Sequence, residues 1–368
     1  MELLIILASL SWLALLVVPW RPWSTREQLE SEIQLEDLSG VTVLIPARNE
    51  AKIVERTLAA LANQGTGLRI ILVDDQSTDG TADLAAATFP HGLTIVSGQP
   101  LRDNWTGKLW ALEQGRTHVQ TDLLLLLDAD IELAPGMVGT LRQKLLTEKL
   151  DLVSIMAKLR MVSFAEKMLV PAFVYFFKLL YPFALGNNPR SRVGVAAGGC
   201  ILIRFKTLQK MGGFTALKGA LIDDCTLARK VKEAGGRNWI GLSHSVRSHR
   251  PYPELSNFWE MVARTAYTQL GYSVLMLALT TLLMLLVFWI PVVGLFWNST
   301  IIRLTASIGL GTMALCYLPM LLYYRRSVLW LLTLPVIGSL YLFMTWSSAL
   351  RYWRGKRSQW KGRMYFNP

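Results

Sequence analysis

The sequence predicts an α/β domain, a parallel sheet with helices on both faces, set between apolar segments at the two ends of the chain. β-branched and leucine-rich runs alternate with helical patterns from residue 40 to residue 127, and strands that alternate with helices at this spacing build parallel sheets. Apolar stretches long enough to cross a bilayer occupy residues 3–20 and much of residues 272–350. The region between them is long enough to bury a sizeable core.

Composition supports a membrane protein. The chain has 368 residues, of which 52% are hydrophobic and 17% are charged, which is apolar for a soluble protein. Residues 3–20 predict an N-terminal anchor at residues 1–22. A cleaved signal peptide is the weaker alternative, because Glu2 replaces a basic start and no small-residue cleavage site follows. A C-terminal membrane region is predicted at residues 272–350, from apolar stretches at 272–297, 301–324 and 328–350.

Much of the net charge of +12 lies beside these apolar stretches. Arg325 and Arg326 follow one of them, and residues 351–368 carry basic side chains but no acidic one. This positive-inside pattern predicts a basic cytosolic tail at an anionic lipid surface, with about 1 kcal/mol of attraction per basic residue. Nucleic acid is a conceivable partner of a basic chain, but the placement of the charge favours the membrane, so we expect no nucleic acid.

Three full C-terminal spans conflict with this charge rule. If the central domain is cytosolic, an odd number of spans after it leaves the basic tail on the opposite side of the membrane. We therefore expect one stretch, with the one that contains Pro291 as the candidate, to be re-entrant or interfacial. The three cysteines show no metal-ligand spacing and fit reduced thiols in a cytosolic compartment.

The predicted domain begins with four buried strands, at residues 40–46, 69–73, 93–96 and 123–127. The helix after the first strand runs to about residue 64 with Asn49 as its N-cap, and Thr78 or Asp79 caps the next helix. A third helix, at residues 107–119, precedes the leucine run of the fourth strand. No G-x-G-x-x-G pattern follows the first strand, which counts against a dinucleotide-binding domain.

Acidic pairs follow two of these strands. Asp128 and Asp130 stand at i and i+2 after the leucine run and point the same way on extended backbone, at the strand end where open α/β sheets bind ligands. Their oxygens suit Mg²⁺ or Mn²⁺ holding a substrate's phosphates, and an acidic turn is the alternative. Asp74 and Asp75 end the second strand, with an Asx turn as the alternative.

Beyond the second acidic pair the pattern is less regular. A helix and a strand are expected at residues 135–147 and 150–156. The aromatic-rich segment 164–186 fits an interfacial helix on the membrane better than a buried core helix. Small residues interrupt a strand at 193–204, where a ligand can approach the backbone closely. An amphipathic interfacial helix is predicted at residues 253–271.

Four motifs stand in a fixed order, at residues 43–50, 73–81, 107–108 and 128–130. In this order and on these elements they resemble the signatures of the inverting family 2 glycosyltransferases, over roughly residues 41–237. The resemblance implies a GT-A fold at residues 38–252, with a mixed sheet flanked by helices, and transmembrane helices at both ends of the chain. It also implies a nucleotide-diphosphate sugar, expected to be a UDP-sugar, as donor and Mg²⁺ or Mn²⁺ as the metal.

The resemblance further implies roles for individual residues. Glu50 would accept a ribose hydroxyl, and Asp74 or Asp75 would accept the imide proton of uracil. Lys108 would lie near the diphosphate, with a solvated helix lysine as the alternative. Asp130 would ligate the metal directly, and Asp128 would contact the metal or the ribose. The expected nucleotide-sugar site comprises Pro46, Ala47, Arg48, Glu50, Asp74, Asp75, Lys108, Asp128, Gly199 and Arg264.

A third acidic pair, Asp223 and Asp224, begins a helix that runs to about residue 234. An inverting transfer needs a base, because the acceptor hydroxyl loses its proton as it attacks. By the match to relatives, Asp224 is the expected base and Asp223 supports it, since the charge of one raises the pKa of the other. Helix capping is the alternative role for the pair.

The amphipathic helix departs from one pattern of the family. Processive relatives carry Q-x-x-R-W there, and only Arg264 matches within residues 261–265, which speaks against polymer synthesis. Arg264 would either contact the diphosphate as a fork donor or anchor the helix at the membrane interface.

Within the family, segments 105–112, 219–225, 261–270 and 360–363 are similar to hopene-associated glycosyltransferases. The similarity implies transfer of a sugar to a hydroxyl of a hopanoid-related membrane lipid. The protein would be a multi-pass protein of the cytoplasmic membrane with a cytosolic catalytic domain. The alternatives are a carotenoid, ceramide-like or polyprenyl-phosphate glycosyltransferase, a polysaccharide synthase, and a membrane scaffold without activity.

Overall fold

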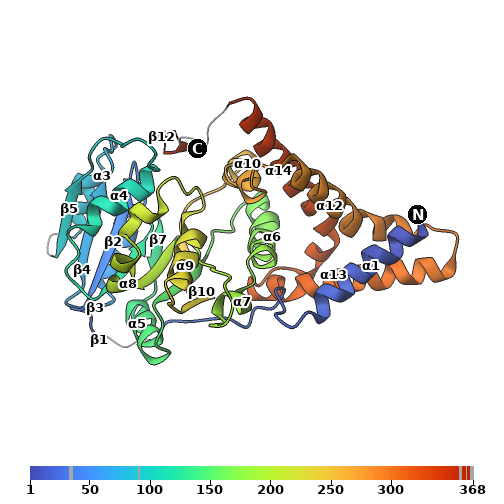
Figure 1. Cartoon of the computed structure of the whole chain (residues 1–368), viewed down its shortest axis with the longest axis horizontal. Coiled ribbons are helices and arrows are strands. Elements are labelled where there is room, and N and C mark those ends of the chain that lie inside the picture. Colours follow the sequence, from blue (N-terminus) through green and yellow to red (C-terminus); the bar gives the residue numbers. More distant parts are fainter. Residues whose placement is uncertain (33–35, 90–91, 356–358, 362, 365–368) are drawn as a thin grey trace. The chain divides into compact units, whose positions relative to one another are not determined.

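The computed structural model describes residues 1–368 except 33–35, 90–91, 356–358, 362 and 365–368. Parts of the predicted basic tail, Tyr365 among them, therefore lie outside the described residues. The chain divides into two compact units (Figure 1). The membrane unit is Met1–Arg26, Met161–Ala184 and Tyr252–Lys356, and the sheet unit is Glu27–Arg160, Leu185–Pro251 and Arg357–Pro368.

The sheet unit is built on eight strands in the order β5-β4-β2-β6-β9-β8-β10-β7. They are β2 (Val41–Ala47), β4 (Arg69–Asp74), β5 (Leu93–Ser97), β6 (Leu123–Leu127), β7 (Ile131–Leu133), β8 (Leu152–Lys158), β9 (Cys200–Arg204) and β10 (Asn238–Ser248). The four predicted strands β2, β4, β5 and β6 are present and parallel. β9 and β7 run antiparallel to their neighbours, which confirms the mixed sheet that the resemblance implied.

The direction of β9 follows from where the chain enters it. Cys200 pairs with Leu127, so β9 starts beside the end of β6 and runs back along it. The strand predicted at 193–204 is therefore shorter than expected, and the small residues before Cys200 form a loop at that edge. Gly194 lies so close to the backbone of Arg229 that a Cβ would come within 2.2 Å of its nitrogen.

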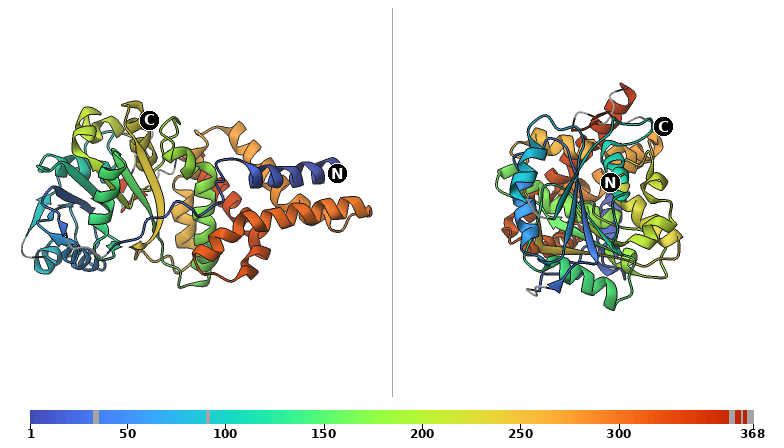
Figure 2. Two further views of the ribbon diagram at one scale, coloured as in Figure 1. Left: turned by 90° about the horizontal axis from the view of Figure 1, so that it is seen from below. Right: turned by 90° about the vertical axis from the view of Figure 1, so that its left-hand side faces the viewer.

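Alternating side chains of the strands contribute to two hydrophobic cores, one on each face of the sheet. Helices flank the sheet on both sides in the right-hand view of Figure 2. Leu123, Leu125 and Leu127 pack with α2 (Val54–Ala62), α3 (Thr81–Thr88) and α5 (Met137–Thr147). Leu124 and Leu126 pack with the opposite layer, which contains α4 (Gly107–Arg116), α8 (Phe205–Lys210), η1 (Gly213–Leu217) and α9 (Asp223–Glu233). This period of two explains why a run of five leucines is buried on both faces.

Two predicted helix caps are wrong. α2 begins at Val54, after Ile53, and α3 begins after Gly80, neither with a side-chain cap. Asn49 has a left-handed φ of 51° and accepts a hydrogen bond from the amide of Thr78 instead. Asp79 lies one residue before the N-cap of α3, where one of its oxygens accepts the amide of Thr81 and the other accepts the amide of Ala51 in the neighbouring loop.

Shorter elements complete the sheet unit. β1 (Glu36–Asp37) pairs with β3 (Gly65–Thr66), and β11 (Gln359–Trp360) pairs with β12 (Arg363–Met364). The Glu30 carboxylate accepts hydrogen bonds from the amides of His244 and Ser245, which fastens the segment before β1 to β10.

The membrane unit contains α1 (Glu2–Val17), α6 (Phe164–Leu180), α10 (Leu255–Ala263), α11 (Ala266–Gln269), α12 (Val274–Gly294), α13 (Thr300–Tyr323), η2 (Val328–Thr333) and α14 (Leu334–Trp353), and α7 (Phe183–Asn187) joins the units. Three of its segments, α12, α13 and η2 with α14, are long and apolar enough to cross a membrane. α1 is shorter and packs on α12 and α13, with the Trp12 indole donating to the carbonyl of Val287 at 2.7 Å. A re-entrant stretch stays a prediction.

Two amphipathic segments of the membrane unit were predicted as interfacial helices. α6 is a regular helix with a capping box formed by Ser163 and Glu166. The helix predicted at 253–271 is instead two helices, because α10 ends at Ala263 and α11 begins at Ala266. Their contact with a membrane surface stays a prediction.

Candidate functional site

Functional side chains gather where four strands of the sheet unit end. β2, β4 and β6 are mutually parallel. β9 is antiparallel to both β6 and β8, so β8 runs in the direction of β6, and β10 is parallel to β8. The residues that follow these strands therefore share one edge of the sheet. Asp75, Asp128 and Arg250 are brought together in this way from distant parts of the sequence.

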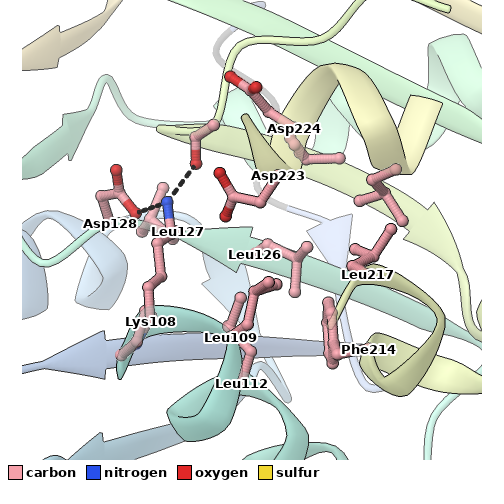
Figure 3. Close-up of a pocket in the computed structure, with 14 residues that line it drawn as sticks. Lys108, Leu109, Leu112, Leu126, Leu127, Asp128, Phe214, Leu217, Asp223 and Asp224 are labelled. Atoms are coloured by element: carbon pink, nitrogen blue, oxygen red, sulfur yellow. Dashed lines mark hydrogen bonds and ion pairs between the residues drawn. The ribbon is translucent and has the colours of Figure 1, made fainter. Parts of the chain in front are cut away.

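The first cluster at this edge is a pocket, which we call the acidic pocket, formed by Lys108, Asp128, Asp223 and Asp224 over apolar walls (Figure 3). The Lys108 ammonium lies 2.6 Å from the Asp128 carboxylate and donates to the carbonyl of Gly198 at 3.3 Å. The Asp223 carboxylate faces this ammonium in Figure 3. The pocket therefore holds three acidic side chains and one basic side chain.

The crowding of acids shifts their ionisation. Burial raises the pKa of Asp224 to about 7, and the neighbouring charge of Asp223 adds to the effect. Burial likewise raises the pKa of Asp128 against the opposing pull of Lys108. The pKa of Lys108 is raised despite its own burial, because Asp128 and Asp223 favour the ammonium. Asp224 is half-buried, so a substrate can reach a carboxyl group that changes its charge near neutral pH.

α9 presents the acidic pair to the pocket. The helix has Ile222 as its N-cap and no side-chain capping bond, but both acids lie in its first turn, where the helix dipole favours a carboxylate. Asp224 accepts a hydrogen bond from the adjacent Cys225 amide at 2.7 Å. A Cβ on Gly198 would lie 3.4 Å from the Asp224 carboxylate and 3.3 Å from the Lys108 ammonium, so the glycine keeps the space between them open.

The second cluster, which we call the paired cluster, comprises Arg48, Glu50, Asp75, Asp130, Arg250 and Lys361. One terminal nitrogen of Arg250 lies 2.8 Å from Glu50 and 3.1 Å from Asp130. Ser248 donates to the other oxygen of Asp130 at 2.5 Å. Although burial opposes the change, Arg250 and Ser248 lower the pKa of Asp130. Each acid of this cluster therefore lies beside a cation.

The predicted nucleotide residues of the first two strands lie at the same edge. Pro46 lines the acidic pocket, and Ala47 pairs with Asp74 at the ends of β2 and β4. Arg48 donates to the carbonyls of Asp75 and Gln76, and its guanidinium lies 3.9 Å from the Asp75 carboxylate.

The sequence pointed to most of this edge but missed several residues. Gly198, one position before the predicted Gly199, lines the acidic pocket, whereas the Gly199 carbonyl accepts the amide of Asp128. Arg250 and Ser248 were not predicted, and Lys361 was expected only as a part of the basic tail. The only signal for Arg250 and Ser248 was their place at the end of a long strand, β10, whose direction the sequence does not give. Arg264 belongs to the membrane unit, so its contact with a diphosphate stays a prediction.

The chemistry of the carboxylates fits a divalent cation that is shared with a substrate. Within the described residues, no group of three or more His, Cys, Asp or Glu side chains forms a metal cage. Mg²⁺ is usually held by one or two carboxylates together with substrate phosphates, and Asp128 and Asp130 supply two such carboxylates at one strand end. Each of them already has a cationic partner, Lys108 or Arg250.

Curated sequences match a part of the chain. Residues of the 4,4'-diaponeurosporenoate glycosyltransferase of Staphylococcus aureus (strain USA300) are 34% identical over 110 residues, 30% of this chain and 28% of that protein. The protein of the same name from Staphylococcus haemolyticus is 33% identical over 98 residues, 27% of this chain and 26% of that protein. The chain thus aligns with little more than a quarter of these relatives.

A solved structure matches nearly the whole chain. The mannosyltransferase PcManGT from Pyrobaculum calidifontis, solved with GDP-Man and Mn²⁺, has a TM-score of 0.57 at 19% identity and covers 96% of this chain and 100% of that one. This likeness confirms the GT-A fold, with its mixed sheet and flanking helices. Residues 42–212 match the family described as glycosyl transferase family 2. Residues 42–212 are therefore similar to family 2 glycosyltransferases, on a GT-A fold, and three helical segments of the chain are long and apolar enough to span a membrane.

Proposed function

We propose that this protein is a membrane-bound inverting glycosyltransferase that moves a sugar from a nucleotide-diphosphate sugar to a hydroxyl group of a membrane lipid. The observation that carries the proposal is the acidic pocket, in which Asp224 has its pKa raised to about 7 and remains accessible. A carboxyl group with this pKa is suited to accept the proton of an attacking hydroxyl near neutral pH.

The other residues of the acidic pocket complete the reaction. Asp223 supports the base by disfavouring a second negative charge beside it. Lys108 supplies positive charge at the strand ends, where charge develops on the leaving diphosphate. Asp128 and Asp130 would hold Mg²⁺ or Mn²⁺, which when bound offsets the charge of the diphosphate. The family domain and the carboxylate pair support the metal, and neither identifies it.

Donor and acceptor are proposed by class. We expect a UDP-sugar, with GDP-sugars as the second class because the similar solved mannosyltransferase was crystallised with GDP-Man. We expect a hopanoid-related lipid as acceptor. The names of the curated relatives favour a carotenoid as the second candidate. The apolar helices of the membrane unit would keep the protein where either lipid is found.

The proposal is tested on membranes from cells that express the full chain. They are incubated with Mg²⁺ and a panel of UDP- and GDP-sugars, and nucleotide release and glycosylated lipids are measured together. We expect one donor class to give both products, with loss of both in EDTA and in Asp224→Asn. Release of no nucleotide from any donor by the wild-type protein would favour the inactive scaffold.

The acceptor is identified by mass spectrometry of lipid extracts from a deletion strain and its complemented parent. We expect a hexose-bearing hopanoid to disappear on deletion and to return on complementation. Loss of a glycosylated carotenoid instead would establish the second candidate. If hopanoid, carotenoid and glycolipid profiles were all unchanged, the lipid acceptor would be wrong.

A further inference from the structure

The antiparallel pair β11 and β12 brings one lysine of the C-terminal tail to the paired cluster. The Lys361 ammonium lies 3.0 Å from the Glu50 carboxylate and donates to the carbonyl of Asn49 at 3.2 Å. The carbonyl of Lys361 in turn accepts a hydrogen bond from Arg48 at 3.0 Å. These three contacts place residue 361 on the segment that follows β2, which is the predicted nucleotide loop.

Glu50 is engaged in a way that the predicted ribose contact does not explain. Its side chain is 6% exposed, and the same carboxylate oxygen is approached by Lys361 at 3.0 Å and by Arg250 at 2.8 Å. A ribose hydroxyl needs only one acceptor site of a carboxylate, so a ribose contact gives no reason for two cations to meet at one oxygen of Glu50. Its position suits a different task, which is to hold two cations at the edge of the sheet.

Both cations have donors to spare. A lysine ammonium has three N–H groups and an arginine guanidinium has five. Among the described residues, Lys361 uses two donors, and the Arg250 side chain bonds through one nitrogen only. Their side chains are 23% and 33% exposed, so the unused donors are within reach of a ligand. Paired, partly exposed cations with free donors match the oxygens of a phosphate group.

We propose that Lys361 is a phosphate ligand of the donor site, held in place by Glu50, and that the C-terminal tail thereby completes the site for the nucleotide diphosphate. This inference rests on the proposed function. On binding, the diphosphate oxygens take donors of Lys361 beside Arg250, and the Glu50 carboxylate competes with them for the same ammonium. Lys361 therefore strengthens diphosphate binding, and Glu50 limits it.

The test measures nucleotide binding by the purified full chain in nanodiscs, by calorimetry, without sugar transfer. UDP, UMP and uridine are compared, or the guanine series if the wild-type protein prefers GDP. Lys361→Ala is expected to weaken UDP binding about tenfold or more and to leave uridine binding unchanged. Lys361→Arg retains most of the affinity because it retains the charge. Lys206→Ala, an exposed lysine on α8, is the matched control and should bind like wild type.

Glu50→Gln separates this role from the ribose role by the sign of its effect. Removing the competing charge should tighten UDP binding and leave uridine unchanged, whereas a lost ribose contact would weaken both ligands. Equal weakening of UDP and uridine in Lys361→Ala would mean that the lysine only supports the fold, and unchanged UDP binding would also overturn the inference. If the wild-type protein binds neither UDP nor GDP, the proposed function itself has failed.

Discussion

The acidic pocket and the paired cluster lie at the same sheet edge and differ in their balance of charge. In the paired cluster the acids Glu50 and Asp130 share Arg250, and Lys361 adds a second contact to Glu50. In the acidic pocket three acids surround Lys108, and the pKa of Asp224 rises to about 7.

The difference indicates a division of labour. In the paired cluster each acidic side chain has a cationic partner, and such a cation can bind a charged ligand in place of the acid. An uncompensated, partly buried carboxyl group holds a proton weakly near neutral pH and can therefore exchange it with a substrate. We infer that the paired cluster binds and the acidic pocket reacts, and three predictions test this comparison.

The largest effect is expected from Asp224→Asn. Transfer should fall by about 100- to 10,000-fold, because a positioned general base contributes a factor of this size. The stability of the fold at pH 8 should increase in this variant. The Asp224 pKa is about 7 in the folded chain against a usual value of 3.8, so folding stability falls as pH rises through that interval. Asparagine carries no charge, and the melting temperature at pH 8 should therefore be higher than that of wild type.

Both measurements are needed for this variant. Calorimetry at pH 8 gives the melting temperature, and nucleotide release gives the rate. A variant that lost activity and also melted earlier would mean that Asp224 is structural, and the acidic pocket would then not differ from the paired cluster.

A smaller loss is expected from Arg250→Ala in the paired cluster. Donor binding should weaken about tenfold to a hundredfold, since hydrogen bonds to charged groups are worth about 1.5–3 kcal/mol. Here stability should fall, because the buried carboxylates of Glu50 and Asp130, at 6% and 7% exposed, lose a cationic partner. Arg250→Lys should recover part of the stability, and Arg247→Ala, an exposed arginine on β10, is the control. A melting temperature that rose in Arg250→Ala would abolish the contrast with Asp224→Asn.

The acidic pocket was easier to predict from the sequence than the paired cluster, for a physical reason. Asp128 and Asp224 adjoin a buried strand and a helix start, and such local patterns are visible along the chain. Arg250 contacts Glu50 because of the direction of β10, and Lys361 contacts it because the C-terminal tail packs against the segment after β2. No local sequence pattern encodes either arrangement.

The errors in the predicted fold have the same origin. Alternation of strands and helices predicted β2, β4, β5 and β6 correctly, but it carries no information on the direction of a strand such as β9. Asn49 has the right residue type for a helix cap. It was misassigned because its side chain bonds to a loop that is distant in the sequence, at Thr78.

The smallest expected effect is a shift in the pH dependence of the transfer rate. This prediction tests the acidic pocket alone. The transfer rate of wild type should fall below about pH 7, as Asp224 takes up a proton and ceases to act as a base. Asp223→Asn removes a neighbouring negative charge and should move this acid limb to lower pH. Lys108→Met removes a positive charge that favours the ionised base, and should move the limb to higher pH.

Opposite shifts are the informative result, because a loss of packing has no reason to depend on the sign of the charge removed. The rate constant kcat/KM is measured from pH 5 to pH 9 for each variant that retains activity, beside Asp122→Asn, an exposed acid at the start of β6. Asp122 does not line the pocket, so its variant should keep the wild-type profile. Shifts in the same direction for Asp223→Asn and Lys108→Met would show that the proton is taken by another group. The distinction between a pocket that reacts and a cluster that binds would then have to be given up.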